Sequence, residues 1–157
     1  MKAAYITHLK KEMQHRSAGE LLDICLRLAR FKKENKELLT YLLFEIQDEQ
    51  AYIDSIKKEI DRQFLEINKS NIYFAKKSIR KIVRNTNKFI RYSGHKQTQV
   101  ELLLHFCRGL KDFGNMMNRS VALSNIYTRQ IQNIEKAISA LHEDLQYDYG
   151  EELKSLL

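Results

Sequence analysis

Residues 71–96 read NIYFAKKSIRKIVRNTNKFIRYSGHK, a stretch without any acid that predicts one long amphipathic helix. At 100° per residue, its apolar and small side chains fall within about 60° of Ile79 and predict a buried stripe. The members of this stripe are Ile72, Ala75, Ile79, Ile82, Val83, Thr86, Ile90 and Ser93. Glycine is a common helix C-terminus, so Gly94 predicts that the helix covers about 72–93.

The cations of this helix occupy a narrow arc on the side opposite the stripe, between about 100° and 200° from Ile79. We call them the cationic row: Lys77, Arg80, Lys81, Arg84, Lys88 and Arg91. Tyr73 lies inside this arc, and Phe74 and Tyr92 lie at its edge. Six like-charge pairs at i,i+3 and i,i+4 cost roughly 1–3 kcal/mol, less with salt. We therefore expect something anionic to face the row.

The basic excess of the whole chain lies in this part of the sequence. The formal net charge is +7, from 27 cations and 20 acids. Residues 67–100 contain nine cations and no acid, which leaves 18 cations against the 20 acids elsewhere. The last part of the chain is acidic, with Lys154 as the only cation near its acids: Glu143, Asp144, Asp148, Glu151 and Glu152.

Three hypotheses follow for the anion that faces the row. The first places acids of the same chain against it, either Glu59, Asp61 and Glu66 of the preceding helix or the acidic last part. The second is phosphates of nucleic acid, with Tyr73 and Tyr92 available for stacking. The third is an acidic protein or peptide bound in a groove between helices.

Composition favours a single all-α domain over residues 1–157. Hydrophobic residues make up 43% and charged residues 30%, which is typical of a globular chain. Proline is absent and there are only five glycines, so turn-rich sandwiches and barrels are disfavoured. Cys25 and Cys107 lie in apolar runs and indicate reduced thiols in a cytoplasmic protein. No signal peptide or membrane-spanning run is predicted.

Apolar periodicity predicts about seven helices, at roughly 2–15, 18–32, 36–46, 49–67, 72–93, 99–113 and 119–145. YDYGEEL, at 147–153, is interpreted as a loop or a short final turn. Capping boxes at Ser17–Glu20 and Thr98–Glu101, and caps at Asn35 and Asp48, predict helix starts. Helix 18–32 is apolar on more than one face and is predicted to be central. One residue on each of four helices is predicted to be buried: Leu26, Leu42, Ile79 and Leu103.

Short connections predict antiparallel hairpins stacked into an armadillo- or HEAT-like α-α superhelix, and a compact up-and-down bundle is the alternative. The stretches RFKKENKELLTYLLFE (30–45) and VELLLHFC (100–107) resemble an uncharacterised bacterial family of all-helical proteins. This resemblance implies the superhelix and no particular activity.

Neither catalytic residues nor a cofactor is predicted. His8, Glu12 and His15 share one helix face that could hold a metal ion, but a solvated face is the favoured interpretation. His105 and Cys107 are two residues apart and should point to different sides of their helix. Asp112–Gly114 spells DFG without the other kinase motifs. The sequence thus predicts a non-enzymatic interaction module, with a metal-dependent enzyme as the minor alternative.

Overall fold

The computed structural model describes residues 1–114, 117 and 119–157, and this part of the chain is helical and contains no β-strand. The all-α prediction is therefore confirmed. Contacts divide the chain into two compact units, Met1–Phe44 and Glu45–Leu157. Each unit is described by itself, and the single domain predicted over 1–157 stays a prediction.

The first unit contains α1 (Ile6–Gln14), α2 (Ala18–Phe31) and α3 (Lys33–Thr40). Helix α3 continues as a π-helical turn, η1 (Tyr41–Glu45), whose last residue is the first of the second unit. The capping box at the start of α2 is confirmed: the Ser17 side chain accepts from the Glu20 backbone N–H, and the Glu20 carboxylate accepts from that of Ser17. Asn35 is not a cap, because α3 begins at Lys33. Its side-chain amide instead donates to the Leu28 carbonyl at 2.8 Å and ties α3 to α2.

No residue of α1, α2 or α3 is buried, so the prediction that α2 is central is wrong. Leu26 is 37% exposed and Leu42 is 48% exposed, which contradicts their predicted burial. A unit of this length has a large surface for its volume and buries only a small part of it, so it cannot enclose a sizeable core of its own. Most of its apolar residues therefore lie on exposed or half-buried helix faces, and Tyr41 of η1 is its buried residue.

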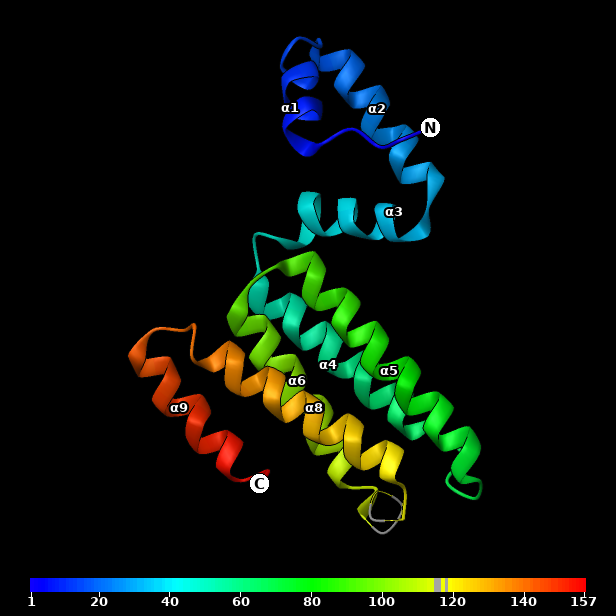
Figure 1. Cartoon of the computed structure of the whole chain (residues 1–157), viewed down its shortest axis with the longest axis vertical. Helices are drawn as coiled ribbons and strands as arrows, with labels where there is room; N and C mark the ends of the chain where they lie inside the picture. Colours follow the sequence, from blue (N-terminus) through cyan, green and yellow to red (C-terminus); the bar gives the residue numbers. More distant parts are fainter. Residues whose placement is uncertain (115–116, 118) are drawn as a thin grey trace. The chain divides into compact units, whose positions relative to one another are not determined.

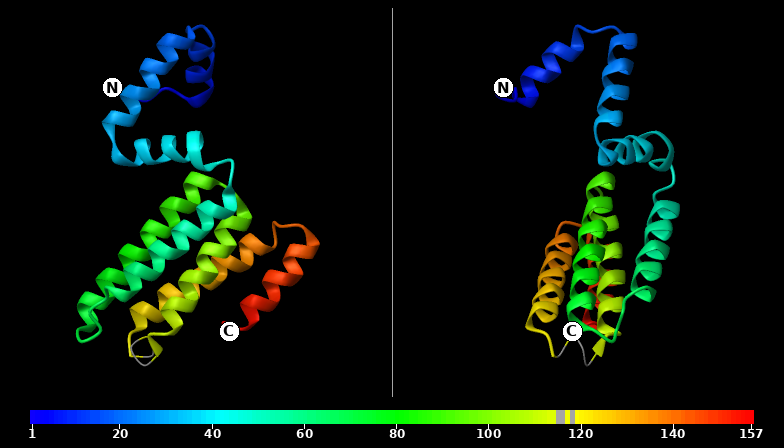
Figure 2. Two further views of the ribbon diagram at one scale, coloured as in Figure 1. Left: turned by 180° about the vertical axis from the view of Figure 1, so that it is seen from behind. Right: turned by 90° about the vertical axis from the view of Figure 1, so that its right-hand side faces the viewer.

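The second unit is built from four long helices that lie side by side, followed by a shorter one (Figures 1 and 2). They are α4 (Glu49–Leu65), α5 (Ile72–Ser93), α6 (Lys96–Lys111), α8 (Val121–Ile138) and α9 (Glu143–Lys154). Helix α6 contacts the other four, and α5 and α8 run in the same direction, opposite to α6 (Figure 1). The central helix is therefore α6, and its consecutive residues Leu102, Leu103 and Leu104 are all buried.

Helix α5 has the predicted bounds and ends at Gly94 as predicted, and the structure adds a cap at its start. The Asn71 side chain accepts from the backbone N–H of Tyr73, and Gly94 ends the helix in the left-handed conformation with φ of 73°. Most of the predicted stripe is buried: Ala75, Ile79, Ile82, Thr86 and Ile90. The predicted burial of Ile79 and Leu103 is confirmed, since both have no exposed surface.

Two predicted helix boundaries in this unit are wrong. Thr98 does not cap α6, which begins at Lys96 after the N-cap His95. Thr98 is instead buried and donates to the Glu49 carboxylate of α4 at 2.5 Å. The predicted helix 119–145 is divided into α8 and α9, and the stretch interpreted as a final turn lies inside α9. The described residues thus form eight α-helices, against about seven predicted.

Candidate functional site

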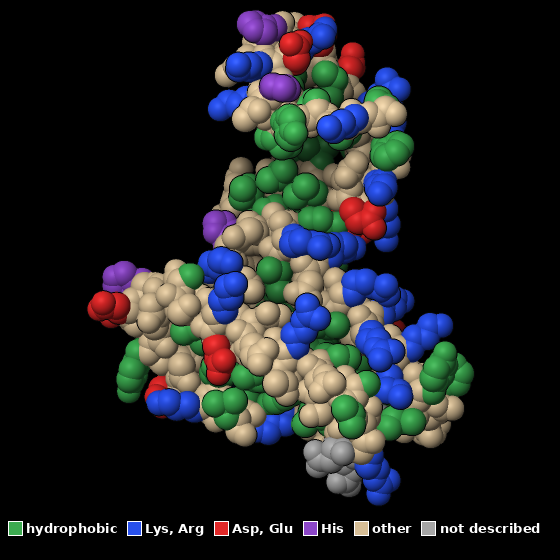
Figure 3. Space-filling view, in the orientation of Figure 1, with side chains coloured by type: hydrophobic (Ala, Val, Ile, Leu, Met, Phe, Trp, Pro, Cys, Tyr) green, Lys and Arg blue, Asp and Glu red, His purple; other side chains and the backbone are tan. Residues whose placement is uncertain are grey.

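The cationic row lies along one face of α5, and most of its members are exposed. Figure 3 shows lysine and arginine side chains gathered along α5 on the side in view. Five cations of the row are exposed: Lys77, Arg80, Lys81, Arg84 and Arg91. None of these five forms an ion pair with an acid in the part of the chain that the structure describes.

The acids of α4 have partners other than the row. Glu59 and Glu66 both pair with Arg62, whose guanidinium lies 2.6 Å from Glu59 and 2.5 Å from Glu66. Asp61 lies 2.6 Å from the Nε2 atom of His105. The hydrogen bond from Arg62 is the main reason that the pKa of Glu59 is lowered, and the charge of Lys81 contributes least. The acids that the first hypothesis assigns to the row are therefore held elsewhere.

The acidic last part of the chain also faces away from the row. It forms α9, which packs on α8 and α6. Glu152 pairs with Arg108 of α6 at 2.6 Å, and Glu151 pairs with Lys154 of its own helix at 2.5 Å. Among the described contacts, no acid of this segment reaches α5.

The aromatic residues at the two ends of the row differ in their surroundings. Tyr73 is 66% exposed and packs edge-on against Phe74 with ring centroids 5.6 Å apart. Tyr92 is half-buried and packs edge-on against Phe89. The Lys88 ammonium lies 4.9 Å from the Phe89 ring centroid and 5.9 Å from that of Tyr92. Lys88 therefore forms a cation–aromatic cluster with Phe89 and Tyr92 near the C-terminal end of the row.

A groove of about 660 Å³ lies beside the row and was missed at the level of sequence. It is lined by α5, by the first turn of α6 and by α8. Its lining contains three arginines, five carboxamides and three aliphatic side chains: Arg84, Arg91, Arg129; Asn87, Gln99, Asn125, Gln130, Asn133; Val83, Ile90, Ile126. No acid lines it, and Arg84 and Arg91 belong to both the row and the groove.

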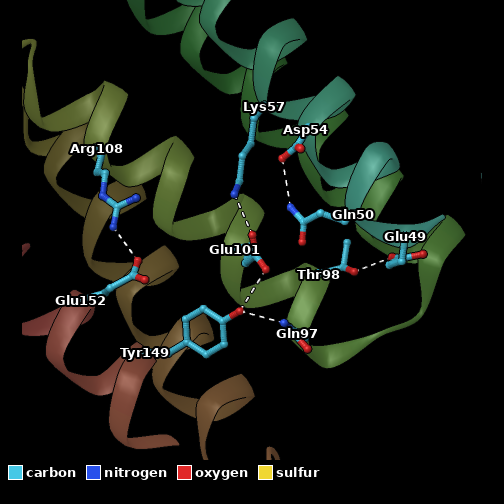
Figure 4. A network of polar contacts seen from close by, with 10 residues as sticks. All are labelled: Glu49, Gln50, Asp54, Lys57, Gln97, Thr98, Glu101, Arg108, Tyr149 and Glu152. Carbon is cyan, nitrogen blue, oxygen red and sulfur yellow. Dashed lines mark hydrogen bonds and ion pairs between the residues drawn. The ribbon is translucent and has the colours of Figure 1, made fainter. Parts of the chain in front are cut away.

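A separate polar network joins α4, α6 and α9 (Figure 4). The Lys57 ammonium lies 2.7 Å from the Glu101 carboxylate, which also accepts from the Tyr149 hydroxyl at 2.9 Å. Gln97 in turn donates to the Tyr149 oxygen at 3.0 Å. Burial and then the Glu101 hydrogen bond raise the pKa of Tyr149 to about 12, so the phenol stays protonated at neutral pH. Because each group is satisfied by another, this network braces three helices.

The residues considered for catalysis or metal binding do not come together. His105 lies against Asp61, whereas Cys107 is fully buried and burial raises the pKa of its thiol to about 12. The two side chains thus point to different sides of α6, as their spacing predicts. His8 and Glu12 lie on α1 with His15 just after it, and no group of three potential metal ligands is found within residues 1–114, 117 and 119–157.

Comparison with known proteins adds no family to this description. No protein-family model, curated protein or solved structure matches the chain. Of the helices in the described ranges, none is both long and apolar enough to cross a membrane.

Proposed function

We propose that this protein is a non-enzymatic interaction module that binds an acidic protein or peptide along the cationic row of α5. The observation that carries the proposal is the set of five exposed row cations without an ion pair to any described acid. Like charges at i,i+3 and i,i+4 destabilise a helix, and a helix exposed only for solubility usually intersperses acids among them. Carboxylates of a partner would remove this repulsion on binding.

The armadillo- or HEAT-like superhelix predicted from the sequence is part of this proposal. What supports it is the order of antiparallel hairpins, α4 with α5 and α6 with α8, and the groove beside the row. A cytoplasmic location, which the two free thiols favour, belongs to the same proposal.

Fluorescence anisotropy with labelled octaglutamate tests the proposed function. Wild-type protein should bind the peptide, and added salt should weaken binding. The variant Lys77→Glu, Arg84→Glu, Arg91→Glu should lose binding, because it reverses three exposed charges of one arc. The control Lys10→Glu, Lys58→Glu, Lys136→Glu makes the same change in net charge at exposed sites outside the row and should keep binding. If both variants lost affinity for the peptide equally, binding would depend on net charge alone, and the proposal would be refuted.

Nucleic acid is the second candidate, and the exposure of Tyr73 and Phe74 at one end of the row favours it. Exposed aromatic rings next to cations can stack on unpaired bases. Five engaged phosphates, one for each exposed cation of the row, would make the affinity for a single strand fall with a log–log salt slope of about −3.5. Oligothymidylate measured in the same assay decides between the candidates: strong binding with this slope, and none for octaglutamate, would favour nucleic acid.

A further inference from the structure

The groove beside the cationic row carries positive charge on two of its sides. Arg84 and Arg91 come from α5, and Arg129 comes from α8. All three are exposed, and none is paired with an acid among the residues described. Guanidinium groups bind carboxylates through two parallel hydrogen bonds. The groove thus presents three sites for carboxylates, and Val83, Ile90 and Ile126 contribute aliphatic surface to its lining.

The five carboxamides distinguish the groove from a surface that only attracts charge. Each carboxamide has an N–H₂ donor and a carbonyl acceptor. Within the described chain, Asn87 donates to the Val83 carbonyl at 2.9 Å, Asn133 donates to Gln130 at 3.3 Å, and Gln99 accepts from Lys96 at 3.4 Å. Each of these contacts uses only one end of a carboxamide, either its N–H₂ group or its carbonyl oxygen. Gln130 is buried, whereas Asn125 is exposed and Asn87, Gln99 and Asn133 are half-buried, so these four can offer their remaining donors and acceptors to a ligand.

The dimensions of the groove suit a short stretch of extended chain. Arg84 and Arg91 are seven residues apart on α5, and Asn125 and Asn133 are eight apart on α8. At a rise of 1.5 Å per residue, these distances are about 10 and 12 Å along the helix axes. An extended peptide rises about 3.3 Å per residue, so three to four of its residues match this length.

The lining favours a peptide over unpaired nucleic acid, because it contains no aromatic side chain. Binding of single strands relies on stacking of bases on aromatic rings, and the exposed rings Tyr73 and Phe74 lie outside the groove. A folded acidic surface is also disfavoured, since its backbone donors and acceptors are already paired within secondary structure.

We propose that the groove between α5 and α8 binds an extended acidic peptide, whose carboxylates pair with the arginines and whose backbone is hydrogen-bonded by the carboxamides. This inference rests on the proposed function and specifies the form of its ligand. Extended acidic segments suit the groove because their like charges keep them extended in solution. The arginines then provide attraction, and the carboxamides recognise the peptide backbone.

Labelled octaglutamate, with and without N-methylation of alternate backbone amides, tests the inference. N-methylation removes backbone N–H donors and leaves the carboxylates in place. The protein variant Asn125→Ala, Asn133→Ala removes carboxamides from the α8 side without changing charge, and alanine favours the helix. The matched control is Ser124→Ala, Gln132→Ala at exposed positions of α8 outside the groove.

Loss of two backbone hydrogen bonds should weaken affinity by about tenfold or more. We expect this loss of affinity when the N-methylated peptide binds wild-type protein and when the unmodified peptide binds the asparagine variant. The control variant should bind with wild-type affinity, and the salt dependence of binding should stay the same. The two changes combined should cost less than the sum of the separate losses, because they remove the same bonds.

Two results separate failure of the inference from failure of the proposed function. If octaglutamate binds but neither N-methylation nor the asparagine variant weakens it, recognition is by charge alone and only the inference is overturned. If wild-type protein does not bind octaglutamate, the proposed function is overturned as well. Tighter binding of oligothymidylate that is lost in the asparagine variant would assign the groove to nucleic acid and overturn the peptide inference.

Discussion

Replacing Arg84 by glutamine should stabilise the folded protein, because this arginine takes part in three like-charge pairs of α5. Its neighbours are Arg80 at i−4, Lys81 at i−3 and Lys88 at i+4. Arg84 has no ion pair in the described part of the chain that would offset this repulsion. At ~0.2–0.5 kcal/mol per pair, the substitution should raise the free energy of unfolding by about 0.6–1.5 kcal/mol at low salt. Glutamine and arginine have similar helix propensities, so the difference reports charge.

Urea unfolding followed by far-ultraviolet circular dichroism measures this change. The stabilisation should shrink in about 1 M salt, where the screening length falls to about 3 Å. Arg62→Gln is the matched control, since its guanidinium pairs with both Glu59 and Glu66 and its loss should destabilise the protein. A lower stability of Arg84→Gln at low salt would mean that Arg84 has an attractive partner in its own chain. The cationic row would then be a structural feature, and the reasoning from unpaired charge would be refuted.

Three further predictions concern the packing and titration of the second unit. Gly109→Ala should destabilise it by about 1 kcal/mol, because the new Cβ would lie 2.7 Å from a ring carbon of the buried Phe64. Gly150→Ala should stabilise it by about 0.5–1 kcal/mol, because alanine favours the helix and the space around Gly150 is open. Urea unfolding that gives both changes the same sign would contradict this prediction. The thiol of Cys107 should resist alkylation at pH 8 until the protein unfolds, while the other cysteine reacts; mass spectrometry that finds both modified equally fast would contradict its burial. The pKa of Tyr149 is raised, so its phenol ionises at lower pH in the unfolded state than in the folded state. Its contribution to the free energy of unfolding is therefore present below pH ~10 and is lost between about pH 10 and 12. The variant Tyr149→Phe should lose less stability than wild type over that pH range, and an equal loss of stability in the two proteins would contradict the raised pKa.

The helix that carries the row could be predicted from sequence because its signals are local. Its buried stripe, the cap at Asn71 and the left-handed Gly94 all act within a few residues of the helix. The same is true of the capping box at Ser17 and of the cap at Asp48, whose side chain accepts from the Ala51 N–H at 2.9 Å. Local hydrogen bonds of this kind depend little on tertiary structure.

Helix boundaries set by tertiary contacts could not be predicted in this way. The pattern Thr98–Glu101 matches a capping box, yet Thr98 lies inside α6 and donates to Glu49 of another helix. The interval between α8 and α9 is hidden because Ile138, Leu141 and Leu145 continue the apolar period across it. Periodicity therefore identified the apolar faces but not where the chain turns.

The central position of α6 also depends on which helices surround it. Sequence favoured helix 18–32, because apolar residues cover more than one of its faces. The structure instead buries the contiguous run at Leu102–Leu104, where α4, α5, α8 and α9 pack around α6. An apolar composition does not determine how many partners a helix has.

Half of the candidate site was visible in the sequence and half was not. The angular positions of the cations around α5 follow from helix geometry alone, and they place Arg84 and Arg91 on one face of the helix. Asn125, Arg129 and Asn133 repeat at i, i+4 and i+8 on α8, a pattern that is typical of any solvated helix face. Only the packing of α5 and α8 against α6 brings these two faces to one groove.

The central claim is that an acidic peptide binds at the α5–α8 face, and its position can be mapped directly by amide chemical shifts. Isotope-labelled protein is titrated with octaglutamate, and the backbone resonances are followed to saturation. The account predicts saturable shifts that are largest around Arg84, Arg91 and Arg129, with little change in α1. Shifts that gather in another part of the chain, or that never saturate, would contradict it.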